Sequence, residues 1–155
     1  MDLNNARNMA LLLMAQHGLD TPSGWRFAWD GARRRFGSCR WDLKLITLSR
    51  HLVALNEEMH VRATILHEIA HALAPRNAGH GPEWRRIARA LGDDGARCYG
   101  AEVAQPARRY VGTCPACGRT VERYTRKRSL ACGACCRAHN GGRHSDAYKF
   151  VWGIK

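Results

Sequence analysis

Apolar residues recur every third or fourth position along three stretches of the chain, and this spacing predicts three helices. The first covers residues 3–17, the second residues 57–74 and the third residues 82–91. Proline stops a helix when it lies just beyond the last turn and suits the first turn of a new one. Pro75 and Pro82 therefore mark the end of the second helix and the start of the third.

The second helix has the clearest pattern. We expect Asn56 to be its N-cap, with Glu57 and Glu58 in the first turn. Its apolar residues repeat at a spacing of four, which predicts one face buried against the core: Val61, Ile65, Ile69 and Leu73. The third helix has a similar predicted stripe: Trp84, Ile87, Ala88 and Leu91.

Short alternating or aromatic-rich segments between the first two helices predict three strands, over residues 25–30, 32–39 and 43–48. The Asp30-Gly31 pair between the first two is a hairpin signal, so we expect a three-stranded antiparallel meander. The third strand should turn one set of side chains toward the second helix: Leu43, Leu45 and Thr47. The three tryptophans of this region are assigned to the core: Trp25, Trp29 and Trp41.

The second helix carries the pattern His67-Glu68-x-x-His71. Residues four apart lie on the same face of a helix, so both imidazoles can bind one metal ion. Zinc held by three protein ligands keeps a position for water and lowers the pKa of that water, and Glu68 lies where it can accept the proton. The pattern therefore predicts a catalytic zinc site.

His80 is the best candidate for the third ligand, because two histidines alone would leave the zinc coordination incomplete. Gly79 and Gly81 flank it and permit the tight turn that brings the chain back after Pro75. Glu83 is a weaker rival ligand.

A second metal-binding pattern consists of two CxxC pairs separated by fourteen residues. This spacing is typical of a zinc ribbon, in which four thiolates complete a tetrahedral sphere and leave no position for water. Its zinc should be structural, held by Cys114, Cys117, Cys132 and Cys135. Cys136, His139 and His144 are alternatives for the fourth ligand, and we favour Cys135. The fourteen residues should form a hairpin between the pairs, and residues 147–152 another strand.

The length of 155 residues and the cysteine pattern suggest two domains, over residues 1–106 and 107–155. The net charge of +12 is unevenly distributed. Residues 1–104 hold 14 Lys and Arg against 11 Asp and Glu, whereas residues 105–155 hold 11 against 2. The net charge of residues 105–155 is therefore +9 (11 minus 2). A zinc ion bound by four thiolates would reduce this net charge to about +7, so the C-terminal part remains strongly cationic. Such a surface favours a polyanionic partner, with nucleic acid the leading candidate.

Basic residues between the two cysteine pairs are the candidate DNA contacts. Their guanidinium and ammonium groups can bind phosphates without base preference, and a tyrosine can stack on an unpaired base of single-stranded DNA. The predicted set is Arg119, Arg123, Tyr124, Arg126, Lys127 and Arg128. The alternative is an ordinary solvated charged face.

HEIAH at residues 67–71 and GHGPEW at residues 79–84, preceded by GSCRWDLKLITLS at residues 37–49, resemble the SprT-like metalloprotease family, which includes the eukaryotic protease Spartan. The resemblance covers most of the chain. It implies an α+β fold, with a zincin-like metalloprotease core of helices and a small, mainly antiparallel sheet, followed by a C-terminal zinc ribbon. It also implies that His67, His71 and His80 hold zinc and that Glu68 is the catalytic base. Relatives include proteases that act on proteins bound or crosslinked to DNA.

Together these patterns predict a zinc metallopeptidase with one catalytic and one structural zinc ion, which cleaves DNA-bound proteins in DNA–protein crosslink repair. Tyr99, Tyr110 or an arginine is the expected further donor to the tetrahedral intermediate. Residues 43–48 are assigned as an edge strand that pairs with an extended substrate.

Two other functions fit parts of the pattern. A deformylase-like hydrolase would use Cys39 as a zinc ligand, but His80 argues against it. A non-proteolytic nucleic-acid-binding adaptor or regulator would rely on the ribbon alone. No segment predicts export or a membrane span, and the seven cysteines favour metal ligation over disulfides. We therefore expect a cytoplasmic, nucleoid-associated protein in a bacterium or a virus host, with no membrane partner.

Overall fold

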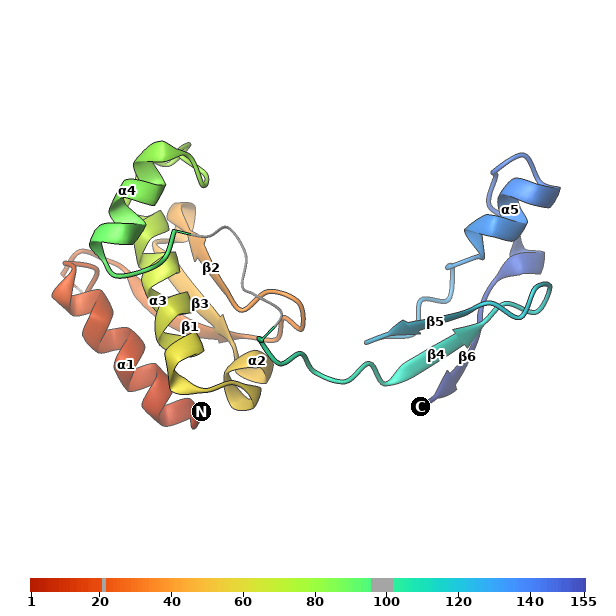
Figure 1. The fold of residues 1–155 in the computed structure, drawn as a ribbon, viewed down its shortest axis with the longest axis horizontal. Helices are drawn as coiled ribbons and strands as arrows, with labels where there is room; N and C mark the ends of the chain where they lie inside the picture. Colours follow the sequence, from red (N-terminus) through yellow and green to blue (C-terminus); the bar gives the residue numbers. More distant parts are fainter. Residues whose placement is uncertain (21, 96–101) are drawn as a thin grey trace. The chain divides into compact units, whose positions relative to one another are not determined.

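The computed structural model describes residues 1–20, 22–95 and 102–155 (Figure 1). The chain divides into two units, Met1–Pro106 and Ala107–Lys155, and each combines helices with a small sheet. The fold class is therefore α+β. In the part of the chain that the structure describes, no helix is both long and apolar enough to cross a membrane.

The described residues of the first unit form four α-helices: α1 (Leu3–Gln16), α2 (Arg50–Leu55), α3 (Glu58–Leu73) and α4 (Pro82–Ala90). The three predicted helices are confirmed, but α2 was not predicted. Ser49 caps it by accepting a hydrogen bond from the Leu52 N–H. The predicted cap of α3 is wrong: Glu57 holds that position, while the Asn56 amide donates to the carbonyls of Leu52 and Ala104.

The first sheet contains β1 (Arg26–Asp30), β2 (Gly37–Arg40) and β3 (Leu45–Ser49), in the order β1-β3-β2. β1 runs parallel to β3 and β2 runs antiparallel to it, so the sheet is mixed and the predicted meander is wrong. Consequently β3 is the central strand and β2 is an edge strand among the described strands. The reason lies at Asp30, whose carboxylate accepts the Ala32 N–H at 2.9 Å and an Arg35 N–H at 2.8 Å. These bonds stabilise a loop at residues 31–36 in place of a two-residue turn.

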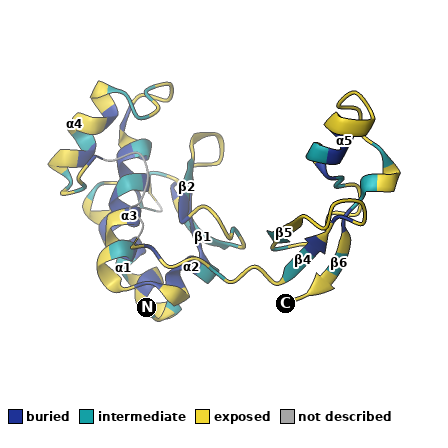
Figure 2. Ribbon diagram, turned by 45° about the vertical axis from the view of Figure 1, so that its right-hand side comes forward, coloured by how far each residue is buried: buried dark blue, intermediate teal, exposed yellow. Residues whose placement is uncertain are grey.

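β3 and α3 supply much of the core of the first unit (Figure 2). The buried side chains of β3 that join this core are Ile46 and Leu48, not the predicted alternate set. Leu43 is exposed, and the Thr47 hydroxyl donates to Asp30 and lies 3.0 Å from the Ser38 hydroxyl. The shift arises because residues 41–43 form a short 3-10 turn before β3 begins.

The second unit has an antiparallel sheet of β4 (Tyr110–Thr113), β5 (Thr120–Arg123) and β6 (Val151–Ile154), in the order β5-β4-β6, and one helix, α5 (Gly133–His139). β5 follows the first cysteine pair directly and pairs back onto β4. The predicted hairpin therefore encloses the first pair and does not lie between the two pairs. The predicted strand over residues 147–152 begins only at Val151, because Asp146–Tyr148 form a 3-10 turn.

Candidate active site and zinc centres

Three histidines of the first unit converge. His67 and His71 lie one turn apart on α3, and His80 lies in the loop before α4. The Nε2 atom of His80 is 3.1 Å from the Nε2 atoms of both His67 and His71. Tetrahedral zinc with bonds of 2.0–2.1 Å separates its nitrogen ligands by about 3.3 Å, so the donor atoms present fit this ion.

A tight loop returns His80 to α3. The Ala78 N–H donates to the Pro75 carbonyl at 2.8 Å, and the Gly81 N–H donates to the Ala78 carbonyl at 2.9 Å. Gly79 adopts a φ of +53°, and a Cβ at Gly81 would lie 2.9 Å from the Ala78 oxygen. Both glycines are therefore required by the turn that places the third histidine.

Trp84, on the first turn of α4, is fully buried beneath the three histidines. Its ring centroid lies 4.7 Å from that of His67, 5.1 Å from that of His71 and 4.6 Å from that of His80. The indole therefore restricts the orientation of all three imidazoles. The sequence predicted that Trp84 is buried, but not that it packs against the three histidines. Its position four residues after His80 was the sequence feature that could have indicated this packing.

Glu68 is buried beside the histidines and packs against the edge strand. A Cβ at Gly37 would lie only 2.8 Å from both Cγ and Oε1 of Glu68, so a glycine there leaves room for the carboxylate. The backbone N–H of Cys39 donates to Glu68. Burial is the main influence on this carboxyl group and raises the pKa of Glu68 to about 7, although the charges of His67 and Arg35 act in the opposite direction. A pKa in this range suits a general base near neutral pH.

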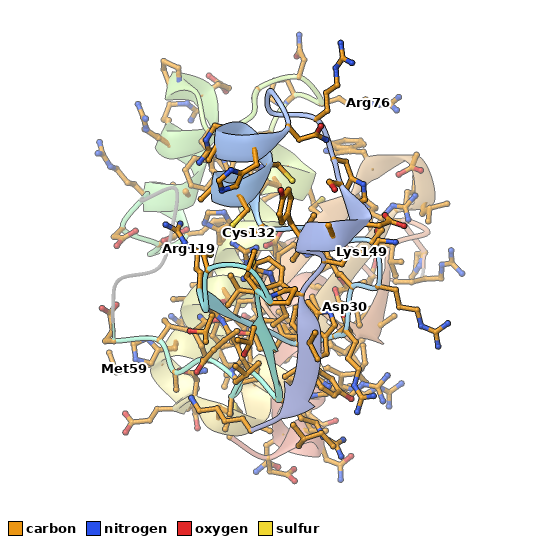
Figure 3. All side chains as sticks on the ribbon, turned by 90° about the vertical axis from the view of Figure 1, so that its right-hand side faces the viewer. Asp30, Met59, Arg76, Arg119, Cys132 and Lys149 are labelled. Atoms are coloured by element: carbon orange, nitrogen blue, oxygen red, sulfur yellow. The ribbon has the colours of Figure 1, made fainter. Side chains whose placement is uncertain are left out.

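A cavity of about 360 Å³ opens at this site. Its wall is formed by β2, α3 and the loop that carries His80, and two arginines, Arg35 and Arg76, line it. The Arg76 side chain is exposed just beyond the end of α3 (Figure 3). Trp41 also lines the cavity, and its indole N–H donates to the His71 carbonyl at 2.9 Å. The prediction that Trp41 belongs to the core is therefore wrong, because its indole is anchored at the cleft wall.

The grouping of the side chains favours histidine ligands over a cysteine ligand. Burial, followed by the nearby His67 and His80, lowers the pKa of His71 to about 4, so its imidazole is neutral at pH 7. Burial, with the charge of Glu68, raises the pKa of Cys39 to about 12, which keeps its thiol protonated. Cys39 lines the cavity but is not part of the group of converging histidines.

The family model for the SprT-like family matches residues 10–105. The chain belongs to the SprT-like family. The matched region contains all three converging histidines and Glu68 and falls within the first unit. Members of this family are associated with metallopeptidase activity, which agrees with a group of residues able to hold a metal. No curated protein matches the chain.

C-terminal to the SprT-like region, four cysteines of the second unit converge: Cys114, Cys117, Cys132 and Cys135. The sulfur atoms of Cys114 and Cys135 are 3.8 Å apart, as are those of Cys117 and Cys132. Zinc with bonds of 2.3 Å to tetrahedral thiolates separates the sulfurs by about 3.8 Å, so this group fits a structural zinc. Cys132 lies at the start of α5 (Figure 3), while Cys136 is buried in that helix and is outside the group.

The predicted DNA-binding residues lie just before, on and after β5. The five basic side chains are exposed, and Arg119 is marked in Figure 3. Tyr124 is half-buried, and its stacking on an unpaired base stays a prediction. Tyr110 on β4 has the Arg126 guanidinium 4.9 Å and the Arg109 guanidinium 5.9 Å from its ring centroid.

Of the candidates for the further donor to a tetrahedral intermediate, Tyr99 lies outside the described residues. Tyr110 belongs to the second unit. Arg35 is the arginine beside Glu68 that the structure places on the cavity wall. Glu83, the rival ligand, is exposed and pairs with Arg86 at 2.7 Å.

Proposed function

We propose that this SprT-like protein is a zinc-dependent endopeptidase that cleaves proteins bound or crosslinked to DNA, with a zincin-like core and a zinc ribbon. Such an enzyme would act in the cytoplasm, at the nucleoid. The observation that supports peptide hydrolysis most strongly is the arrangement around α3. Three imidazole Nε2 atoms converge within ligand distance, and a buried carboxylate from the adjacent residue, Glu68, lies against the cleft strand.

Zinc, when bound by His67, His71 and His80, would supply a Lewis acid that polarises the scissile carbonyl and lowers the pKa of a water molecule. Glu68 accepts a proton from the attacking water and delivers it to the leaving nitrogen. Gly37 and the Cys39 N–H hold its carboxylate in place for both transfers. Trp84 beneath the histidines excludes water from the opposite side of the site.

The edge strand β2 is the proposed binding surface for an extended substrate, in place of residues 43–48, which form the central strand. The Ser49 N–H donates to the Phe36 carbonyl at 2.7 Å, so these two residues form a hydrogen-bonded pair. Hydrogen-bonded and non-hydrogen-bonded pairs alternate along an antiparallel ladder, so Gly37 and Cys39 belong to the pairs that are not hydrogen-bonded to β3. The backbone groups of Gly37 and Cys39 therefore point away from β3. Because the Cys39 N–H is bonded to Glu68, the proposed substrate contacts are the Gly37 backbone and the Cys39 carbonyl. An added substrate strand binds such groups through its main chain, with little preference for side chains.

Replacing Gly37 with alanine should reduce kcat/KM for peptide cleavage by about 10- to 100-fold, because the new Cβ displaces the Glu68 carboxylate. Zinc content should remain unchanged. Gly31→Ala is the matched control, since a Cβ there meets no atom within 4 Å. Cleavage rates and zinc content are measured for both variants. Wild-type kcat/KM in Gly37→Ala would contradict the proposed placement of the base.

The second unit supports the DNA-associated part of the proposal. Its basic residues are exposed around β5, and residues 105–155 have 11 Lys and Arg against 2 Asp and Glu. A polyanion bound here would bring the protease to proteins on the same nucleic acid, so that shared occupancy would select the substrate. The same charge favours a second candidate function, a non-proteolytic nucleic-acid-binding adaptor or regulator.

Cleavage of a DNA-binding protein, with and without single-stranded DNA, tests the proposal and separates the two functions. Neutralising Arg126, Lys127 and Arg128 to glutamine should lower DNA affinity and reduce the slope of log K against log salt by about 2. DNA-stimulated cleavage should fall, whereas cleavage of a short peptide should not. An equal charge change on the first unit is the control: Arg50, Arg62 and Arg85 to glutamine.

Two outcomes would contradict parts of this proposal. An unchanged salt slope in the neutralised variant would place DNA binding elsewhere. Intact DNA binding by a wild-type protein that cleaves neither the DNA-binding protein nor the peptide would favour the adaptor function.

A further inference from the structure

Asp93 lies against His67 on the side opposite the converging Nε2 atoms. Its Oδ2 atom is 3.3 Å from the Nδ1 atom of His67, and the Asp93 side chain is 6% exposed. Apart from this contact, Oδ2 is buried without a hydrogen-bond partner in the described part of the chain. A buried carboxylate oxygen costs free energy unless a neighbouring group donates a proton to it, and the His67 Nδ1 atom is placed to do so.

The end of α4 fixes Asp93 in this place. The Gly92 N–H donates to the Arg89 carbonyl at 3.1 Å, and the Asp93 N–H donates to the Ala88 carbonyl at 3.0 Å. With Gly92 at a φ of +89°, these two bonds form a Schellman motif. The chain therefore turns back at the end of α4, and the first residue after the turn glycine reaches α3. The same short helix thus carries His80 before its first turn and Asp93 after its last turn.

The geometry also determines which nitrogen of His67 carries the proton. Nε2 of His67 is 3.1 Å from Nε2 of His80, on the side where the metal ligands converge, so it must supply its lone pair. In a neutral imidazole the proton then belongs to Nδ1, which is the atom facing Asp93.

We propose that Asp93 is a positioning residue for the zinc centre. Its carboxylate accepts the His67 Nδ1–H, holds the ring in the tautomer that presents Nε2 to the metal, and makes that nitrogen a stronger donor. At 3.3 Å the pair is just longer than an ideal hydrogen bond, so a small rotation of the ring completes it. This inference rests on the zinc-binding part of the proposed function and does not depend on peptide cleavage.

Replacing Asp93 with asparagine keeps the size of the side chain and removes its charge. The affinity of the histidine site for zinc should fall by about 10- to 100-fold. It is measured on the full chain by competition with a chelator, with the cysteine site as an internal reference whose affinity should not change. His80→Ala identifies which phase of zinc release belongs to the histidine site. Glu83→Gln is the matched control, because it removes a carboxylate from the same helix without touching His67.

A spectroscopic measurement distinguishes positioning from a general role in folding. In proton–nitrogen spectra of the zinc-loaded protein, the His67 Nδ1–H resonance should be protected from exchange in the wild type. In Asp93→Asn it should shift and exchange faster, while the ring resonances of His71 and His80 stay in place.

Zinc affinity within twofold of wild type in Asp93→Asn, or an unchanged His67 resonance, would overturn the proposal. If Asp93→Asn instead weakens zinc at both sites, the residue supports the fold and the proposal is also wrong. A wild-type protein that binds zinc tightly but cleaves no peptide would contradict the proposed peptidase activity. It would leave the proposal for Asp93 intact, because the zinc affinities of the wild type and Asp93→Asn can still be compared.

Discussion

Glu68→Gln is expected to reduce kcat/KM for peptide cleavage by about 10²- to 10⁴-fold, because glutamine cannot accept the proton from the attacking water. The variant should still bind zinc at His67, His71 and His80, since the substitution preserves the size of the side chain against Gly37. Cleavage of a DNA-binding protein and of a short peptide is measured for both proteins, together with zinc content. Equal activity of wild type and Glu68→Gln would exclude Glu68 as the base.

The pH dependence provides a second readout for the same residue. Glu68 acts only when ionised, and burial raises its pKa to about 7. Wild-type kcat/KM should therefore rise with pH toward neutrality. Because a bound cation lowers the pKa of Glu68, this rise should lie at or below pH 7 in the zinc-loaded enzyme. Any residual activity of Glu68→Gln should lack this rise.

The same pKa predicts a change in stability. In the metal-free protein, folded Glu68 retains its proton up to a pKa of about 7, whereas the ordinary value is 4.5. The free energy of unfolding should therefore decrease as pH rises between these values, by at most roughly 3 kcal/mol. Urea unfolding of metal-free Glu68→Gln should show less of this decrease. If the metal-free wild-type protein is instead more stable at pH 8 than at pH 5 by roughly 3 kcal/mol, the assigned burial of the Glu68 carboxylate is contradicted.

His80→Ala is expected to have the second of the two largest effects: loss of zinc from the first unit and of all peptide cleavage. Two histidines one turn apart leave the coordination sphere incomplete, and the removed Nε2 atom is the one that lies 3.1 Å from both others. Zinc content should fall from about two ions per chain to about one, because the four cysteines retain theirs. Metal analysis after dialysis measures the change.

Cys39→Ser is the matched control for this prediction. Cys39 lines the same cavity, but it stands outside the converging group of histidines. Zinc content should therefore remain at the wild-type level. The opposite pattern, with zinc lost in Cys39→Ser and retained in His80→Ala, would favour a deformylase-like site.

Local patterns in the sequence predicted the candidate metal-binding residues of this protein. Helical spacing alone places His67 and His71 on one face of α3, because residues four apart in a helix must share a face. Pro82 at the first turn of α4 and the flanking glycines predicted the return of His80. The two CxxC pairs predicted the four-cysteine group and favoured Cys135 over Cys136, and the structure brings Cys135 into the group. Each of these features is encoded within a few residues, so it can be read without the fold.

Strand order was determined only by the tertiary structure. Asp30-Gly31 predicts a hairpin, yet β1 and β2 both pair with β3 and not with each other. Strand pairing depends on partners distant in the sequence, and here the bonds of the Asp30 side chain stabilise a longer loop. The same long-range pairing makes β2 the edge strand beside the cleft, a role that the sequence had suggested for β3.

The surroundings of the histidines also required the tertiary structure. Trp84 and Asp93 both lie within or beside α4, and only the packing of α4 against α3 brings them to the imidazoles. Gly37 begins one of the segments that carry the family resemblance, but the reason for a glycine there appears only in the 2.8 Å that a Cβ would leave to Glu68. The sequence by itself thus predicted the candidate ligands and the candidate base, since these follow from local spacing and turn residues. Packing between distant elements decided how those groups are oriented, buried and presented to a substrate.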